Sequence, residues 1–268
     1  MTTPAPAGDL HRRRLWLYVI ATAAMIFLLI PTLLIVPMSF SDARFLSFPP
    51  PAWSIRWYEN YWKSIEWTSA TWVSLKIALL TMLVATPLGT LAAYGLRMSR
   101  SRLAGAIFTI LAAPLVVPVI FIAIGVFYLY ARLNLLYTTA GLVIAHTTLA
   151  LPFVVALVGS ALESFDENLE RCARILGAPR WRAFLTVTLP QIRFSIVSAA
   201  LLAFLTSFDE VIIALLISGG TNETLTRKMF TTLRDQIDPT IAAISTILIG
   251  ISVGCILLFQ ALQAKADD

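Results

Sequence analysis

The chain has 268 residues, of which 58% are hydrophobic and 13% are charged, and its formal net charge is +5. A water-soluble domain carries about 25% charged residues, so this composition excludes an ordinary soluble globular protein. The apolar residues fall in long runs, and a run of about 20 residues is what a helix needs to cross a bilayer.

Six apolar runs predict six membrane-spanning helices, because lipid leaves unpaired backbone groups no water to bond. The first run follows three arginines but is longer than a signal-peptide core, so we interpret it as a retained helix. The third contains Pro114 and Pro118, which predict a kink. The runs lie near Leu15–Met38, Ala70–Tyr94, Ala104–Tyr130, Ala140–Ala161, Ile192–Ile217 and Thr240–Leu262.

The predicted fold class is therefore an all-α integral membrane protein. We expect a membrane domain over residues 15–262, with short tails at 1–14 and 263–268. Six spans would place both tails on one side of the membrane. Twelve Lys and Arg residues lie in segments on that side and seven on the opposite side, with Lys76 inside a span. An excess of positive charge marks the cytoplasmic side, so both termini are predicted to be cytoplasmic.

Residues 163–191, ESFDENLERCARILGAPRWRAFLTVTLPQ, form a polar loop between the fourth and fifth runs. Ser164 and Glu167 have the spacing of a capping box, which predicts where a first helix begins. Gly177 has the position of a residue that ends a helix, and Pro179 suits the first turn of a second one. One face of the first helix would carry Leu169, Cys172, Ala173 and Leu176. One face of the second would carry Trp181, Phe184, Leu185 and Thr188.

Three interpretations of this loop compete. It could pack on its own helix bundle, it could read DNA as a helix–turn–helix, or it could dock a cytoplasmic partner. The loop carries equal numbers of acids and arginines, whereas binding to nucleic acid needs positive charge. The exposed aromatic face needs a partner, so docking is the leading hypothesis and no nucleic-acid partner is expected.

The loop resembles the signature of binding-protein-dependent ABC importer permeases: Glu-Ala-Ala, three residues, Gly, nine residues, Ile, one residue, Leu-Pro. Gly177 matches the glycine, Val187 stands for the isoleucine, and Leu189–Pro190 match the end. The leading triplet is Arg171–Ala173, with Arg and Cys in place of Glu and Ala. A glutamate does stand one position earlier, at Glu170. The segments 38–62, 208–220 and 224–249 also look like parts of spermidine/putrescine-type permeases.

The resemblance implies the type I ABC importer permease fold, with six transmembrane helices and a cytoplasmic coupling helix that sits in a groove of an ATPase dimer. It implies further partners: a second permease subunit, favoured as a different chain, a periplasmic substrate-binding protein and the bacterial inner membrane. ATP and Mg would be bound by the ATPase, because this sequence contains no phosphate-binding loop, so no cofactor and no enzymatic activity are expected in the chain. The residues expected to couple it to the ATPase are Glu170, Arg171, Cys172, Ala173, Gly177, Ala178, Pro179, Trp181, Leu189 and Pro190.

Ionisable residues inside a span are costly, which makes Asp209 and Glu210 in the fifth run candidates for the substrate path. Acids there would suit a cationic solute such as a polyamine; either residue could instead be a structural partner of a basic side chain. Lys76 could reach the outer surface or pair with Asp209. His146 stands alone in the fourth run and is interpreted as a hydrogen-bonded packing residue, so no metal site is expected.

Two classes of function remain from the sequence. The first is the permease subunit of an ATP-driven importer that works by alternating access, with a polyamine as the leading substrate and another amine, an opine-like compound or ferric ion as alternatives. The second is a membrane protein outside the ABC class, such as a secondary transporter or an intramembrane enzyme. A secondary transporter favours inverted repeats with broken helices, and an enzyme needs a buried catalytic set; the sequence shows neither.

Overall fold

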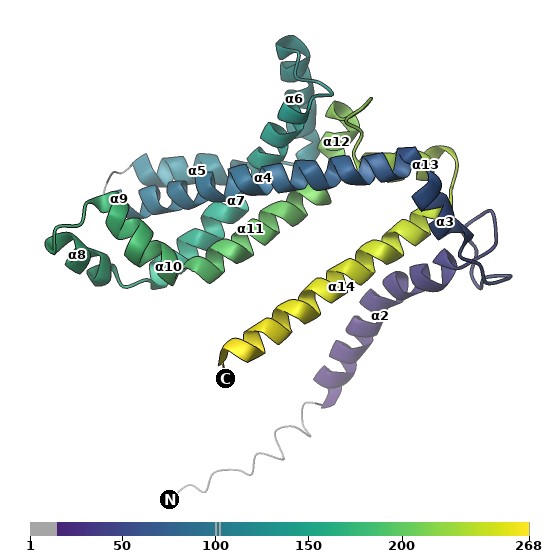
Figure 1. The fold of residues 1–268 in the computed structure, drawn as a ribbon, viewed down its shortest axis with the longest axis horizontal. Helices are drawn as coiled ribbons and strands as arrows, with labels where there is room; N and C mark the ends of the chain where they lie inside the picture. Colours follow the sequence, from purple (N-terminus) through teal and green to yellow (C-terminus); the bar gives the residue numbers. More distant parts are fainter. Residues whose placement is uncertain (1–14, 100, 102, 268) are drawn as a thin grey trace, which may run out of the picture. The chain divides into compact units, whose positions relative to one another are not determined.

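The computed structural model describes residues 15–99, 101 and 103–267 (Figure 1). Within them the regular structure is helical, apart from isolated bridges between Ser41 and Trp53 and between Gly219 and Asn222. The described chain divides into two compact units, residues 15–65 with 232–267 and residues 66–231. The predicted tail at 1–14 lies outside the described residues.

The smaller unit is built from both ends of the described chain. Helices α2 (Leu15–Ser39) and α14 (Thr240–Asp267) contact each other, and α14 also contacts the short helix α3 (Arg56–Lys63). Asn60 Nδ2 donates to Thr240 Oγ1 at 2.8 Å, which ties α3 to the start of α14. The apolar side chains of α2 are largely exposed, as expected for a helix that lies in lipid.

The larger unit is a bundle around α7 (Thr139–Ser164), which has more buried residues than any other helix of this unit. Helices α5 (Leu103–Val116) and α11 (Arg193–Phe208) pack on α7, and α12 (Ile212–Ile217) packs on α6 (Val119–Leu133) and α7. One core cluster joins α4 (Ile65–Met98), α7 and α11 through small and branched residues. The fully buried residues of this cluster are Ala85, Ala150, Val154, Val158, Ala199 and Ala203.

The third apolar run is broken more sharply than a kink. Helices α5 and α6 meet at an angle of 102°, and Figure 1 shows α6 turning away from α5. Pro114 lies inside α5 and Pro118 caps the start of α6. Because a proline supplies no backbone N–H and its ring crowds the preceding turn, the two prolines end one helix and set the start of the next.

The prediction of one continuous helix over Ile192–Ile217 is wrong. Helix α11 ends at Phe208, with Asp209 as its C-terminal cap, and α12 begins only at Ile212. Glu210 lies in the break, where its Oε1 accepts a hydrogen bond from Ile213 N at 2.8 Å. A carboxylate that accepts from a first-turn N–H stabilises the start of a helix, so local polar residues interrupt the apolar run.

By length and composition, three helices are suited to cross a membrane: Trp16–Ser39, Ile65–Met98 and Thr139–Ser164. Two bent helix pairs could each form one further span, which would raise the number of spans to five. These pairs are α5 with α6, and Arg180–Gln191 with α11, which meet at 80°. The sixth predicted run corresponds to α14, whose apolar part includes Thr240–Gly254. The helix itself extends to Asp267, beyond the end of that run.

Gly89 allows α4 to approach α7 closely. A methyl group at Gly89 would lie 2.5 Å from Val154 Cγ1 and 2.7 Å from Val154 Cβ, on a branched side chain with no free end to move. We therefore expect Gly89→Ala to lower stability by about 1–3 kcal/mol, measured as the unfolding midpoint in detergent. Gly95→Ala, on the same helix with open space around it, is the matched control and should not lower the midpoint.

Candidate functional site

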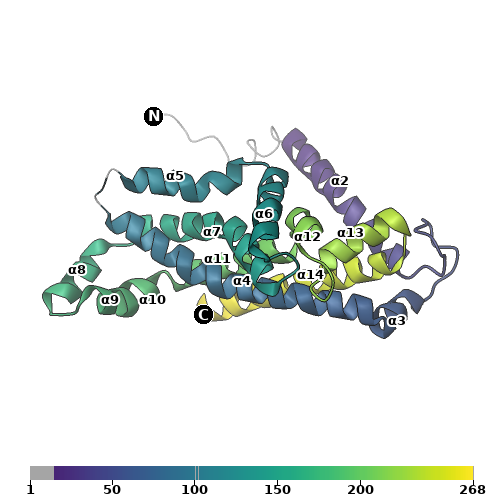
Figure 2. The same cartoon turned by 90° about the horizontal axis from the view of Figure 1, so that it is seen from above.

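The polar loop predicted at 163–191 is a folded hairpin of short helices. It consists of α8 (Glu167–Ile175), α9 (Arg180–Ala183), the π-helical turn η1 (Phe184–Thr188) and α10 (Leu189–Gln191). Figures 1 and 2 show α8 and α9 lying beyond the end of α4, at the same end of the larger unit in both views. The prediction of two helical pieces is confirmed, and we call residues 163–191 the loop hairpin.

The predicted capping box at Ser164 is wrong. Ser164 is the last residue of α7 and its hydroxyl donates backwards to Ser160 O at 3.4 Å. Asp166 caps α8 instead, with Oδ1 accepting from Asn168 N at 2.9 Å. An ionised aspartate at this position also interacts favourably with the helix dipole, which explains why it prevails over the serine.

Gly177 ends α8 in the way that its sequence position predicts. Its φ is +95°, a left-handed conformation that favours glycine. Gly177 N donates to Arg174 O at 3.0 Å, and Ala178 N donates to Ala173 O at 3.1 Å. These two bonds form the Schellman motif, which satisfies the last carbonyl groups of the helix. Pro179 then caps α9, one position before the first-turn place predicted for it.

The bend between α8 and α9 carries an exposed apolar tip. Ile175 and Leu176 are 84% and 87% exposed, and Trp181 is 66% exposed. Cys172 is exposed and free, whereas Ala173 and Ala178 are half-buried. The face predicted for α8 is therefore open in this chain, and exposed apolar groups clustered in this way are typical of surfaces that contact another protein or a membrane.

The second predicted face is split between the inside and the outside. Phe184 and Thr188 are 7% and 0% exposed, whereas Trp181 and Leu185 point away from the core. The ring of Phe184 lies 4.4 Å from that of Tyr94 on α4, measured between centroids. The inner half of this face thus attaches the hairpin to the bundle and leaves the outer half free.

A π turn precedes Pro190. In η1 the N–H of Leu189 bonds to the carbonyl of Phe184, five residues back rather than four. Pro190 lacks an N–H and its ring would clash with the carbonyl four residues before it in a regular α-helix. The wider turn relieves that clash. Leu189 and Pro190 then start α10, with Leu189 half-buried and Pro190 exposed.

Glu170 is the buried polar centre of the hairpin and is only 4% exposed. Its Oε1 accepts a hydrogen bond from the Tyr94 hydroxyl and its Oε2 accepts one from Thr188 Oγ1, both at 2.6 Å. Distances this short are typical of hydroxyl groups that donate to an ionised carboxylate. One side chain on α8 therefore ties together α8, η1 and the end of α4.

A second, more exposed carboxylate reinforces this connection. Glu167 Oε1 lies 3.2 Å from Arg97 Nη2 on α4, and its Oε2 lies 3.1 Å from Arg171 Nη2 on its own helix. Sequence reasoning found Glu170 but missed its partners Tyr94 and Thr188, and it missed Arg97 as a partner of Glu167. Tyr94 and Arg97 belong to another helix, and a single sequence holds no signal for such distant contacts.

The predicted substrate-path acids lie at the break between α11 and α12. Asp209 is exposed and Glu210 is half-buried, with its carboxylate engaged in capping α12. Lys76 is exposed on α4, and no ion pair joins it to Asp209 within the described residues. His146 is 1% exposed and its Nδ1 lies 2.8 Å from Ser207 Oγ, which confirms its interpretation as a hydrogen-bonded packing residue.

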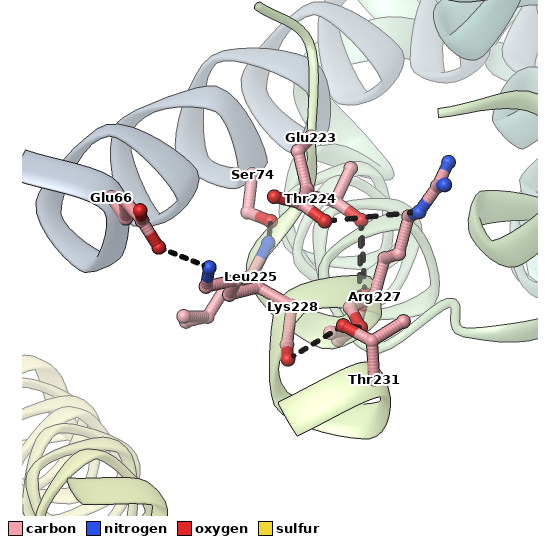
Figure 3. Close-up of polar contacts among 9 residues, drawn as sticks. Glu66, Ser74, Glu223, Thr224, Leu225, Arg227, Lys228 and Thr231 are labelled. Atoms are coloured by element: carbon pink, nitrogen blue, oxygen red, sulfur yellow. Dashed lines mark hydrogen bonds and ion pairs between the residues drawn. The ribbon is translucent and has the colours of Figure 1, made fainter. Parts of the chain in front are cut away.

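A polar cluster at the opposite end of α4 from the hairpin fixes the start of α13 (Leu225–Asp235), as Figure 3 shows. Ser74 Oγ accepts from Leu225 N at 2.8 Å, and Lys228 Nζ donates to Glu66. Arg227 lies 3.8 Å from Glu223. These contacts hold the segment after α12 against α4 within the larger unit.

Comparisons with known proteins agree with this architecture. The family described as "Binding-protein-dependent transport system inner membrane component" matches residues 85–267. The putrescine transport system permease protein PotI of Escherichia coli K12 is 32% identical over 260 residues, 94% of this chain and 92% of its own. The spermidine/putrescine permease protein PotC of Haemophilus influenzae is 29% identical over 240 residues, 89% of this chain and 93% of its own.

A solved structure shows the same fold at lower identity. A chain of a bacterial ABC transporter involved in importing the acidic polysaccharide alginate superposes with a TM-score of 0.71 at 15% identity, over 97% of this chain and 99% of that one. The matched family region contains the loop hairpin and the bundle around α7. The chain belongs to the family of binding-protein-dependent transport system inner membrane components: it is a membrane-embedded ABC permease subunit of the type I fold, and not an enzyme.

Proposed function

We propose that this permease imports a polyamine of the spermidine or putrescine type, by alternating access driven by a separate ATPase. The relatives at 32% and 29% identity over nearly the whole chain are named for these solutes. The exposed Asp209 at the break between α11 and α12 supplies a negative charge that would suit a cation. A break of this kind leaves backbone and side-chain groups open to a solute, as irregular segments in transporters do.

We further propose that the loop hairpin docks a dimeric ABC ATPase on the cytoplasmic side, with both termini of the chain on that side. The single observation that carries this proposal is the combination of an exposed apolar tip with a buried anchor. Leu176 and Trp181 are exposed at the tip, while Glu170 fixes the base of the hairpin to α4. A docking element that transmits motion needs a surface that binds the partner protein and a rigid attachment to the helix bundle. ATP and Mg would be bound by the ATPase and not by this chain.

The remaining partners follow from the same family. One permease chain would form half of a translocation pathway, so a second permease subunit, favoured as a different chain, completes it. A periplasmic substrate-binding protein would deliver the solute to the side opposite the hairpin. Alternating access would then consist of rigid-body movement of the bundle as the ATPase dimer closes and opens.

Copurification from native membranes in mild detergent tests the ATPase proposal. We expect the wild-type chain to bring with it an ATP-hydrolysing subunit and a second permease. Replacing two tip residues, Leu176→Asp with Trp181→Ala, should remove the ATPase but not the second permease. Phe194→Ala, which alters an aromatic residue on α11 that is 63% exposed, is the matched control and should retain both. An ATPase that stays bound to the tip variant at wild-type yield would contradict docking through the hairpin.

The substrate proposal predicts a specific effect of Asp209. Asp209→Asn removes one negative charge and should raise the KM for putrescine about tenfold, the equivalent of ~1.4 kcal/mol for one charge-assisted contact. The measurement is uptake of radiolabelled putrescine by proteoliposomes that contain the whole importer. Glu210→Gln keeps an acceptor for Ile213 N and should change KM less. Asp235→Asn, an exposed acid beside Arg234, is the control. An unchanged KM in Asp209→Asn would remove this residue from the path.

A further inference from the structure

A cavity of about 480 Å³ lies between the end of α4, helix α8 and the start of α9. Its charged lining consists of Arg97, Glu167, Glu170, Arg171, Arg174 and Arg180. The four arginines come from three different helices, and the fold brings Arg97 on α4 to the three that lie within residues 171–180. We call this cavity the arginine pocket.

The two carboxylates of the pocket do not neutralise all of its positive charge. Both oxygens of Glu170 accept hydrogen bonds from hydroxyl groups, those of Tyr94 and Thr188. Glu167 is engaged by Arg97 and Arg171. Four guanidinium groups against two carboxylates leave the pocket with two positive charges in excess. Guanidinium groups held close together repel one another, and a bound anion would relieve that repulsion.

Arg174 and Arg180 are the groups available to such an anion. Within the described part of the chain, neither has an acceptor for a hydrogen bond or a partner in an ion pair. A guanidinium presents a planar fork of N–H donors that matches phosphate oxygens in pairs. We propose that the arginine pocket binds a phosphoryl group of one negative charge or more, supplied by the headgroup of an anionic phospholipid or by free phosphate.

The position of the pocket along α4 favours the lipid. The apolar run of this helix ends at Tyr94, and Arg97 is three residues later, an axial rise of at most about 4.5 Å. The headgroup layer of a bilayer is about 5–7 Å thick on each side. With the end of this apolar run at the edge of the hydrocarbon layer, Arg97 would lie at the depth of the lipid phosphates, and basic pockets beside membrane helices on the cytoplasmic side bind anionic headgroups.

The proposal does not depend on docking of an ATPase. The apolar tip residues Ile175, Leu176 and Trp181 do not line the arginine pocket, so a headgroup and a protein partner could be bound together. A phospholipid in the pocket would contact α4, α8 and α9 at once. It would thereby add to the attachment that Glu170 provides between the hairpin and the bundle.

Native mass spectrometry of the full chain, purified with any subunits that accompany it, provides the test. The protein is mixed in detergent with equal amounts of phosphatidylglycerol and phosphatidylcholine, and the retained lipid is counted. We expect wild type to retain phosphatidylglycerol in preference, and Arg174→Gln with Arg180→Gln to reduce that retention about tenfold. Arg182→Gln, the same change on α9 but outside the pocket lining, is the matched control and should behave as wild type.

A second arm separates the two sources of the phosphoryl group. Inorganic phosphate is added to the lipid-loaded protein at increasing concentration. If phosphatidylglycerol stays bound as phosphate is added, the headgroup is the source of the phosphoryl group. If phosphate displaces the lipid from the site formed by Arg174 and Arg180, free phosphate is the source. Equal retention of both lipids by wild type, or unchanged preference in the double variant, would overturn the proposal. So would loss of the ATPase from the double variant with no change in lipid retention, because the pocket would then serve a protein. Failure of the wild type to bring down an ATPase would instead bear on the proposed function alone.

Discussion

Glu170→Ala should abolish most ATP-driven transport while leaving the helix bundle folded. The change removes the carboxylate to which both the Tyr94 and Thr188 hydroxyls donate, and Thr188 is fully buried. Hydrogen bonds to charged groups contribute about 1.5–3 kcal/mol each, so the base of the hairpin loses about 3–6 kcal/mol. The contact of Phe184 with Tyr94 would remain as the main inner attachment. We expect putrescine uptake by proteoliposomes of the whole importer to fall at least about tenfold.

Two further variants make this result specific. Glu170→Gln keeps an amide that can accept from one hydroxyl and donate to the other, so uptake should fall to a value between wild type and alanine. Glu163→Ala removes an exposed acid from the same loop and should have no effect. Wild-type uptake in Glu170→Ala would show that the tie to α4 is dispensable. Equal losses in Glu170→Ala and Glu163→Ala would show that only the charge of the loop matters.

Gly177→Trp should break the connection to the ATPase without unfolding the bundle. Gly177 has a φ of +95°, and any side chain in the left-handed region costs about 1–2 kcal/mol. No atom lies within 4 Å of the place that its Cβ would take, so the core is not disturbed. The indole would instead occupy the bend beside the apolar tip. We expect the ATPase to be lost on copurification and ATP-driven uptake to fall to background, with normal expression and an unfolding midpoint lowered only by the strain at this position.

Alanine variants separate the backbone from the bulk of the side chain. Gly177→Ala adds only the strain of the left-handed conformation and should reduce uptake partially. Gly159→Ala, in the interior of α7 with open space around it, has no such strain and should leave uptake unchanged. Retained ATPase and retained uptake in well-expressed Gly177→Trp would contradict the role of the bend. An unfolded Gly177→Trp protein would contradict the statement that the position is open.

The turn chemistry of the hairpin could be read from the sequence because it depends on neighbouring residues. Gly177 ends a helix through its own conformational freedom and Pro179 starts one through its fixed φ, so both positions were predicted to within one residue. Ser164 was misassigned because α7 continues through it, and only the tertiary packing of α7 decides where that helix ends. Ser164 and Asp166 are both residue types that cap the start of a helix, and it is the charged Asp166 that caps α8.

The anchor of the hairpin could not be predicted, because its partners are distant in the chain. Glu170 is 76 residues from Tyr94, and a buried glutamate on a polar helix looks the same in sequence as an exposed one. The break at Asp209 and Glu210 was missed for another reason. A hydropathy average over many residues hides two acids within an apolar run. In the structure, the carboxylate of Glu210 accepts a hydrogen bond from the first turn of α12, so a new helix begins there.

The π turn before Pro190 gives the hairpin one residue more than a regular α-helix would use over the same length. Each residue of an α-helix corresponds to about 100° of rotation and 1.5 Å of rise. Because the extra residue fits without lengthening the helix, residues before the turn face about 100° away from the direction that unbroken α-helical numbering would give them. Because η1 lies between α9, which carries Trp181, and α10, this one residue decides which way the exposed Trp181 faces relative to α10.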